Sequence, residues 1–516
     1  MKNYFKKALA LLMALSLIMI VGCSKGKSTK ESDQETVSAS DTTDVEASSN
    51  EDTSSQDAES SSDNEEKDDD KNNNSSKGEN KEKDKNNNSS KNENKDKNNN
   101  SSKGENKDKD KNTNSSKEEN KNDKENTSEE QVKKLTVWDV SNNPSMAAAA
   151  VKFEREHKNV KINVVNTGYT SLSSLKSAIA SSTAPDIVVM DHVYLVSAGA
   201  NGYLLDLNKY GAKNIKSQFM STCWDASGRD GKIYGLPFDA NTICFIYNKE
   251  RFIEANAKVP SNYNELKAAA AALKTKGTVS SPITFSFNET GAHNKNFAAF
   301  QFFFWLWRNG GEILSSDYKK ATFNSQAGVD ALQQIVDLYK NDYVSDKYDQ
   351  ASFIAGNIGI MENGTWMYEG LFTGSNKGRY GVALMPELKK GVKQYSGLGL
   401  YCYGVTSGSK NPELAYEFIS EFCTTSAYQV TFAKSAGRIP SLLAAQKNAY
   451  YQTAEWQTFI KQLGMSKARP GVNNWDNIES YIADSVYQAI SGKSTPKEVL
   501  DAAAKYVNTM LARTYN

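Results

Sequence analysis

The sequence predicts an α/β protein whose folded part is divided into two lobes. Strand-like and helix-like segments alternate along residues 133–516, which favours largely parallel sheets covered by helices. This part, about 380 residues long, is too large for one hydrophobic core, because single cores stop growing at about 250 to 300 residues. Residues 24–130 hold almost no apolar side chains, so we expect them to contribute to neither core.

The folded part opens with a predicted β-α-β unit. Asn143 followed by Pro144 is typical of a helix start, and residues 160–164 alternate between apolar and polar side chains as a strand does. A third strand is expected over residues 184–190. A second Asn-Pro pair at Asn411 predicts the start of a later amphipathic helix.

The stretch KIYGLPFDANTICFIYNKERF, residues 232–252, predicts a strand, a break and a second strand. Pro237 is expected to interrupt the ladder, since proline has no backbone N–H to donate. Asp239 and Asn241 are polar side chains within apolar runs, and buried polar groups need a partner. We expect a ligand to be that partner. The alternative is that these side chains cap helices or bond to nearby backbone.

The first 22 residues have the pattern of an export signal. Three lysines within the first seven residues precede the apolar run Ala8–Ile20, which is too short to span a bilayer comfortably. The run ends in Gly22 and Cys23, which resembles a bacterial lipobox. Residues 1–22 are therefore expected to be a lipoprotein signal peptide, and Cys23 the lipidated first residue of the mature chain. An ordinary secretory signal followed by a chance cysteine is the alternative.

Residues 23–132 are expected to carry the lipidated cysteine and a disordered hydrophilic spacer. A degenerate repeat that begins KNNNSSKGEN at Lys71 has no apolar face to stack, so we do not expect a repeat fold. A flexible coil of about 110 residues has a root-mean-square span of roughly 60 Å. The spacer would hold a folded domain well away from a membrane.

Composition and motifs favour recognition over chemistry. The 62 basic and 62 acidic residues balance, and no basic patch points to nucleic acid. No zinc-protease, phosphate-loop, nucleophile-elbow or EF-hand motif is present, and we expect no metal, no cofactor and no catalytic residue. The cysteines after Cys23 lack metal-ligand spacing and are expected to be buried free thiols, although pairing stays open. One enzymatic alternative is a glycosidase pair drawn from Asp139, Asp191, Asp239 and Glu362.

Six further segments strengthen the interpretation of residues 232–252. The segments are KFEREHKNVKINVV, APDIVVM, ANGYLLDL, DGKIYGLPFDANTICFIYNKERF, ATFNSQAGVDALQQIVDLY, FIAGNIGIMENGTW and KNPELAYEFISEFC, counting the stretch itself. Together, and in this order, they resemble the bacterial extracellular solute-binding proteins of family 1, which include maltodextrin-binding protein and serve ABC importers. The resemblance implies a periplasmic-binding-protein-like fold of two lobes joined by crossing strands. The predicted lobes are about 133–240 with 399–450, and about 243–395 with 452–516.

The resemblance also implies a ligand site between the lobes. Met190 stands where a relative has an aromatic platform, which puts the same sugar arrangement in doubt, whereas MENGTW places a tryptophan at a stacking position. Trp305 and Trp307 are expected in the core, and Gly397–Gly399 in a return crossing. The expected ligand-binding residues are Asn142, Asn143, Asp191, His192, Tyr194, Asp239, Asn241, Gln301, Trp366 and Trp475.

The implied function is a non-enzymatic, monomeric receptor on the outer face of a Gram-positive cell membrane. It would be anchored by the lipid on Cys23, capture an oligosaccharide by hinge closure, and pass it to ABC permease subunits. Aromatic rings, amides and carboxylates suit a carbohydrate, which presents apolar C–H faces rimmed by hydroxyls. A secreted carbohydrate-active hydrolase and a surface-displayed carbohydrate adhesin are the alternatives.

Overall fold

The computed structural model describes residues 131–140, 143–288 and 295–515. The expected signal peptide, Cys23, nearly all of the expected spacer and Asn142 lie outside these residues. No helix in the described ranges combines the length and the apolar character that a membrane crossing needs.

The strands are β1 (Lys133–Asp139), β2 (Val160–Asn166), β3 (Ile187–Asp191), β4 (Gly228–Arg229), β5 (Lys232–Ile233), β6 (Leu236–Asn248), β7 (Ser281–Thr284), β8 (Ile358–Gly364), β9 (Tyr380–Ala383), β10 (Ser396–Val405), β11 (Ile439–Pro440) and β12 (Ser466–Lys467). The helices are α2 (Pro144–Glu156), α3 (Leu172–Ala180), α4 (His192–Ala200), α5 (Ser221–Asp225), α6 (Lys249–Glu254), α7 (Tyr263–Lys276), α8 (Lys295–Arg308), α9 (Gln326–Lys340), α10 (Gln350–Ala355), α11 (Tyr368–Phe372), α12 (Pro412–Thr424), α13 (Ser426–Ser435), α14 (Ala454–Leu463), α15 (Trp475–Ile490) and α16 (Pro496–Tyr515).

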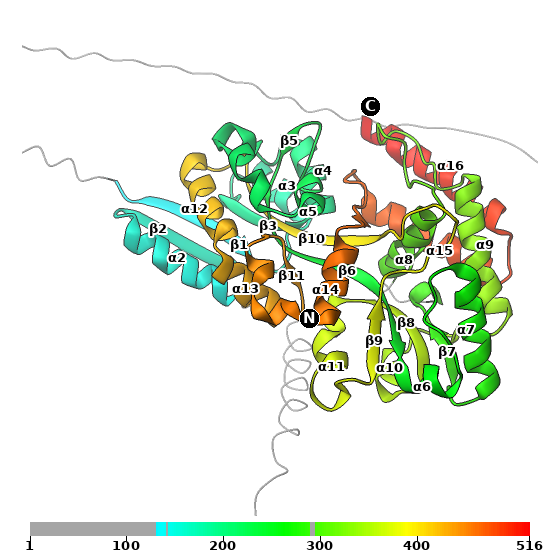
Figure 1. Ribbon diagram of the computed structural model, residues 1–516. Helices are drawn as coiled ribbons and strands as arrows, with labels where there is room; N and C mark the ends of the chain where they lie inside the picture. The colour runs from blue at the N-terminus through cyan, green and yellow to red at the C-terminus, as the bar shows by residue number, and fades with distance from the viewer. Residues whose placement is uncertain (1–130, 141–142, 289–294, 516) are drawn as a thin grey trace, which may run out of the picture. The chain divides into compact units, whose positions relative to one another are not determined.

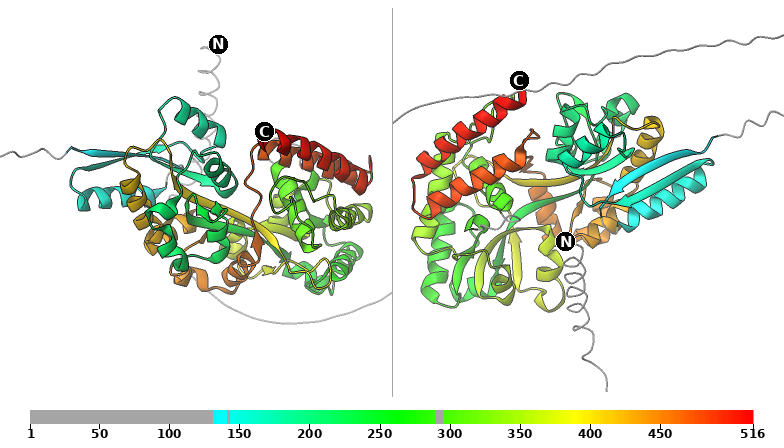
Figure 2. Two further views of the ribbon diagram at one scale, coloured as in Figure 1. Left: turned by 90° about the horizontal axis from the view of Figure 1, so that it is seen from above. Right: turned by 180° about the vertical axis from the view of Figure 1, so that it is seen from behind.

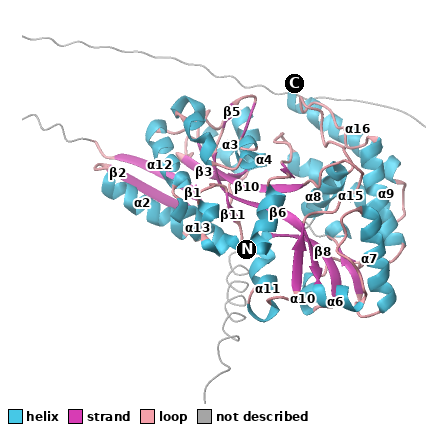
Figure 3. Cartoon of the chain, viewed as in Figure 1, coloured by secondary structure: helices cyan, strands magenta, loops and turns pink. Residues whose placement is uncertain are grey.

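The predicted two-lobe α/β fold is confirmed, and one sheet runs through both lobes. Its strand order is β2-β1-β3-β10-β6-β8-β7 (Figure 3). Strands β1, β2 and β3 are parallel to one another, and so are β7 and β8. The two long strands between these groups, β6 and β10, run antiparallel to their neighbours. Figure 1 shows β6 and β10 extending from the β1–β3 lobe toward the β7–β9 lobe.

Strand β6 is the predicted first crossing. Its first half, up to Thr242, pairs with β10, and its second half, from Ile243, pairs with β8 and β9. The expected break at Pro237 is wrong, because β6 runs without interruption through it. The register shifts between the Asp239 and Pro237 pairs, so the strand accommodates the proline with a β-bulge, which tolerates a residue that cannot donate. The predicted return crossing is β10.

Each lobe holds an apolar cluster, and a third cluster contains residues of both lobes. In the first lobe, Leu135 and Val137 of β1 pack with Phe153 of α2 and with Phe418 and Phe422 of α12. The core of the second lobe gathers around α8, α9 and α15. Strand β1 and helix α16 lie at opposite ends of the folded part in both views of Figure 2.

Local signals in the first lobe behave as the sequence predicts. Asn143 caps α2 by accepting hydrogen bonds from the backbone of Ser145 and Met146, and Pro144 opens the helix. Helix α12 begins at Pro412 as expected, although the side chain of Asn411 makes no cap hydrogen bond. The four described cysteines are free and buried, as predicted: Cys223, Cys244, Cys402 and Cys423.

Helix α8 carries a buried charged residue of the second lobe, Arg308. The Arg308 guanidinium lies 2.9 Å from a Glu362 oxygen, and neither side chain reaches solvent. Gln301 and Trp305 also donate to Glu362, at 3.2 and 3.1 Å. Trp305 and Trp307 are buried, so the prediction that they are core residues is confirmed. The Glu362 carboxylate is thus paired within the interior of the second lobe.

In the first lobe, β1 ends at a buried carboxylate, Asp139. Its Oδ1 accepts a 2.6 Å hydrogen bond from the Tyr403 hydroxyl, which in turn accepts one from Asn143, while Oδ2 has no hydrogen-bond partner in the described part of the chain. Burial raises the pKa of Asp139 to about 6, and the hydrogen bond from Tyr403 lowers it only in part.

We predict that Asp139→Asn changes how the free energy of unfolding depends on pH. Between the unfolded pKa of 3.8 and the folded pKa of about 6, the native state of the wild type holds more protons than the unfolded state. Its stability therefore falls as pH rises, by up to about 1.4 kcal/mol per pH unit from this one group. The difference in the free energy of unfolding between the wild type and Asp139→Asn, measured by urea denaturation, should fall by about 2 kcal/mol between pH 4 and 7.

The control is Asp317→Asn. Asp317 is exposed, and the hydroxyl of Ser315 lowers its pKa. The free energy of unfolding of the wild type minus that of Asp317→Asn should therefore not fall over the same pH range. A wild type minus Asp139→Asn difference that stays constant from pH 4 to 7 would contradict the assignment.

Candidate functional site

The candidate site lies on one face of the sheet where β3, β10 and β6 meet. Tyr401 of β10 pairs with Asp191 on one side and with Asp239 on the other, so these three side chains form a row. Two residues along, Gly399 pairs with Asn241. Because side chains two apart on a strand share a face, Asn241 and the row point the same way. We call these five residues the crossing face.

Arg438 forms an ion pair with Asp239 at one end of the row. Its Nη1 lies 3.0 Å from Asp239 Oδ1, and its guanidinium lies 4.4 Å from the centre of the Tyr401 ring. Burial raises the pKa of Asp239 to about 6 even though Arg438 favours its charged form. Asp239 therefore has a protein partner, contrary to our expectation that it faces a ligand alone. Arg438 reaches it because the next strand, β11, pairs Pro440 with Asp239.

Arg469 satisfies the other end and connects the lobes. Its Nη2 lies 3.1 Å from Asp191 Oδ2, at the end of β3, and its Nη1 lies 3.0 Å from Glu479 in α15. Burial opposes ionisation of Asp191, but Arg469 holds the pKa of this carboxyl below its usual value. Burial raises the pKa of Glu479 to about 6, despite the same arginine. One guanidinium thus bridges a carboxylate of each lobe.

Aromatic rings border the crossing face. Phe300 lies 4.9 Å beneath the Arg469 guanidinium and packs on Gly397 of β10, where a Cβ would come within 2.3 Å of the ring. Trp366, which follows β8, is 41% exposed and meets Phe297 edge to face at 6.2 Å. Any residue larger than glycine at Gly397 would displace Phe300. The position of the Phe300 ring therefore depends on glycine at position 397 of β10.

Asn241 is the crossing-face side chain with the clearest capacity to bind. Its amide lies over Gly399, whose missing Cβ leaves the space, and the side chain is 8% exposed. Within the described residues, no hydrogen bond to this side-chain amide is formed. An amide that supplies both a donor and an acceptor is therefore available to a ligand.

The other predicted residues that the structure describes are either hydrogen-bonded to protein groups or buried. Asn143 binds Tyr403 and caps α2, and the Tyr194 hydroxyl donates to Asp476 of α15. Gln301 and Trp475 are buried in the second lobe. Ligand binding by any of these residues stays a prediction. Sequence reasoning missed Tyr169, Tyr401, Arg438, Arg469 and Glu479.

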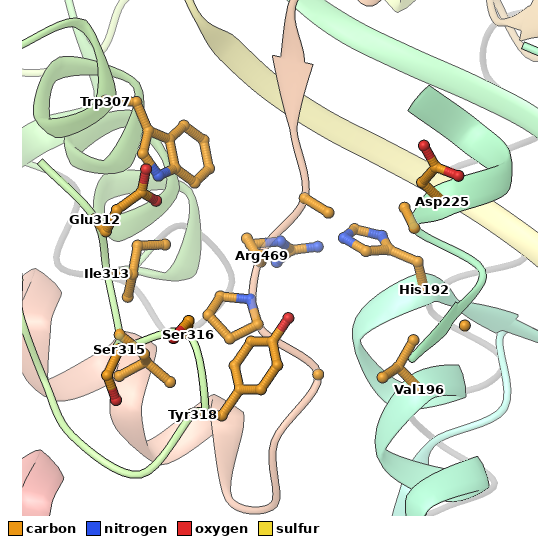
Figure 4. Close-up of a pocket in the computed structure, with 16 residues that line it drawn as sticks. His192, Val196, Asp225, Trp307, Glu312, Ile313, Ser315, Ser316, Tyr318 and Arg469 are labelled. Atoms are coloured by element: carbon orange, nitrogen blue, oxygen red, sulfur yellow. The ribbon is translucent and has the colours of Figure 1, made fainter. Parts of the chain in front are cut away.

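His192 is buried beside Asp191, with its Nδ1 3.2 Å from Asp191 Oδ1. It lines a cavity of about 430 Å³ between the lobes, together with Arg469. Figure 4 shows His192 and Val196 on one wall, Trp307 and Tyr318 on the other, and Arg469 between them. Residues of both lobes line this cavity, so the shape of the cavity depends on how the lobes are arranged.

The possible glycosidase carboxylates do not all converge. Asp191 and Asp239 flank Tyr401, and each is held by an arginine. Glu362 is buried against Arg308. The arrangement that the described residues make is a paired, hydrogen-bonding surface bordered by aromatic rings.

Comparison with known proteins agrees with this architecture. The chain is 26% identical over 396 residues to a binding protein of Brucella abortus (strain 2308), covering 72% of this chain and 92% of that protein. It is 25% identical over 385 residues to the galactooligosaccharide-binding protein of Bacillus subtilis (strain 168), covering 72% and 88%.

Solved structures share the fold. The cyclic α-maltosyl-1,6-maltose binding protein from Arthrobacter globiformis is similar with a TM-score of 0.64 at 24% identity, over 73% of this chain and 98% of that one. The sugar-binding protein MalE from Xanthomonas citri is similar with a TM-score of 0.66 at 19% identity, over 74% and 98%. Residues 148–459 match the family model described as bacterial extracellular solute-binding protein, which covers more than half of the chain. The chain therefore belongs to the bacterial extracellular solute-binding proteins.

Proposed function

We propose that this protein is the lipid-anchored receptor of an ABC importer and that it captures an oligosaccharide between its lobes. The observation that carries the proposal is the crossing face, where the amide of Asn241 has no hydrogen-bond partner among the described residues and lies on β6, a strand shared by both lobes. A ligand bound there contacts the hinge itself. Contacts to both lobes would stabilise a closed state, because a ligand shifts a conformational equilibrium by its differential affinity for the two states.

Carbohydrate is the ligand class that the surroundings favour. Sugars need donors and acceptors around their rims and apolar rings against their C–H faces. Asn241 supplies the first and the exposed Trp366 the second. Relatives named for galactooligosaccharide and maltodextrin binding support the class.

Binding without conversion is the outcome we propose. A glycosidase needs one carboxyl that donates a proton and a second that attacks or activates water. Asp191 and Asp239, the two carboxyls of the crossing face, are each engaged by a guanidinium. These pairs favour a fixed recognition surface over proton transfer. A saccharide recovered chemically unchanged after saturation binding would agree, and hydrolysis products would contradict this part of the proposal.

We predict that maltotetraose or a β-1,4-galacto-oligosaccharide raises the melting temperature of the protein, since binding to the native state stabilises it by mass action. Asn241→Ala should weaken binding of that sugar by about 1 to 3 kcal/mol, because a sugar hydroxyl is left unpaired. Trp366→Ala should weaken it by a similar amount, about 1 to 3 kcal/mol, through loss of a stacking ring. Calorimetric titration measures both.

The control is Ile253→Ala on α6, which truncates a side chain that is 79% exposed. It should bind as the wild type does, and the apo melting temperatures of the Asn241 and Trp366 variants should remain close to that of the wild type. Normal affinity in both site variants would contradict the proposed site. Lost apo stability with normal affinity would assign Asn241 to the fold instead.

The anchor belongs to the same proposal. Cys23, at the end of an apolar N-terminal run, would carry fatty acyl chains and hold the receptor at the outer face of the cell membrane beside its permease. We predict that cells fed a clickable fatty acid label the wild type and not Cys23→Ala. Incorporation of label into Cys23→Ala would contradict the anchor.

A further inference from the structure

Tyr169 is an exposed aromatic residue that no sequence signal singles out. It lies in the loop between β2 and α3 and is 44% exposed. The loop is tied to strand ends on both sides of it. Thr167 N donates to Asp139 O of β1 at 3.0 Å, and Thr170 N donates to Val189 O of β3 at 3.2 Å. The loop therefore holds Tyr169 at the edge of the crossing face before any ligand arrives.

Two contacts fix the orientation of the Tyr169 ring. It stacks on Tyr401 with centroids 3.8 Å apart and an angle of 13° between the planes. Its hydroxyl accepts a hydrogen bond from Arg438 Nη2 at 3.4 Å. Because Tyr401 covers one face of the ring, the exposed area of Tyr169 belongs to the other face and the ring edge. Burial raises the pKa of the Tyr169 hydroxyl, so the ring is neutral at physiological pH.

Trp366 borders the same arginine segment from the second lobe. Gly437, the residue before Arg438, has φ of 60°, and a Cβ there would come within 2.8 Å of the Trp366 Cα. Met190, near the end of β3, is fully buried and pairs with Cys402 inside the sheet. The exposed ring that the first lobe presents at this edge is therefore Tyr169, from the loop between β2 and α3.

We propose that Tyr169 is the aromatic platform of the first lobe, on whose open face a pyranose ring of the ligand stacks. This inference rests on the proposed function and deepens it, because it specifies a saccharide with an exposed apolar C–H face. The Tyr401 stack and the Arg438 hydrogen bond orient the ring in advance, which reduces the ordering cost of binding. Asn241 lies on the same face of the sheet for the hydroxyl rim.

Titration calorimetry on the full chain tests the platform with maltotetraose and β-1,4-galactotetraose as probes. Tyr169→Ala should weaken binding at least about tenfold. Tyr169→Phe keeps the ring and should stay within about threefold of the wild type. The matched control is Tyr481→Ala, since Tyr481 is 37% exposed and stacks on Tyr506 at 4.0 Å with an angle of 9°. It should leave affinity unchanged.

A second measurement does not depend on the alanine variant folding. In wild type labelled with 3-fluorotyrosine, the ¹⁹F resonance that disappears in Tyr169→Phe should shift when the probe sugar is added. Wild-type affinity in Tyr169→Ala, or a Tyr169 resonance that saturating sugar leaves in place, would overturn the inference. If the wild type binds neither probe nor any other saccharide, the proposed function fails and the platform fails with it. Binding by the wild type separates the two failures.

Discussion

The structure depends on two strands that belong to both lobes. Strand β6 leaves β10 at Thr242, joins β8 at Ile243 with no loop between, and joins β9 at Phe245. Thr242 and Ile243 are buried at this junction, and Asn241 beside them is 8% exposed on the crossing face. A polar residue there must find its partner in another segment or in a ligand. The rest of the site follows from how that requirement is met.

Two arginines are the partners of most of the polar side chains on the crossing face. Arg438 and Arg469 bind the two carboxylates that flank Tyr401, and Arg469 also binds Glu479 of the second lobe. Removing one partner of such a buried pair costs about 3 to 5 kcal/mol, because a charge is left uncompensated. The pairs therefore fix the position of Tyr401 and of the ring stacked on it. Among the described residues, the side chain of Asn241 lies beside them without a hydrogen-bond partner.

Local elements were predictable from the sequence because their signals are local. The Asn143-Pro144 helix start and the alternation in β2 rest on neighbouring residues. The crossing strand was also predictable from a resemblance, but its continuity through Pro237 was not. The bulge that accommodates the proline is a property of the pairing with β10, which lies more than 150 residues further along the chain.

The arginines and Tyr169 could not be predicted for the same reason. Arg469 pairs with a carboxylate 278 residues earlier, and neither residue carries a signal of the other. Gln301 follows the opposite pattern: its sequence position suggested the cleft, yet Ser286 and Glu362 engage it inside the second lobe. Its amide resembles Asn241 in chemistry. Only the neighbours, set by tertiary packing, distinguish them.

Closure of the lobes on a sugar is the central claim, and a distance across them tests it most directly. Spin labels can be attached at cysteines replacing Val151 on α2 and Ile253 on α6, which are 68% and 79% exposed, in a chain carrying Cys23→Ala. The four described native cysteines are buried and free. A saccharide that raises the melting temperature should move the label-to-label distance, measured by double electron–electron resonance, to one new and narrower distribution. An identical distribution with and without that saccharide would contradict the account.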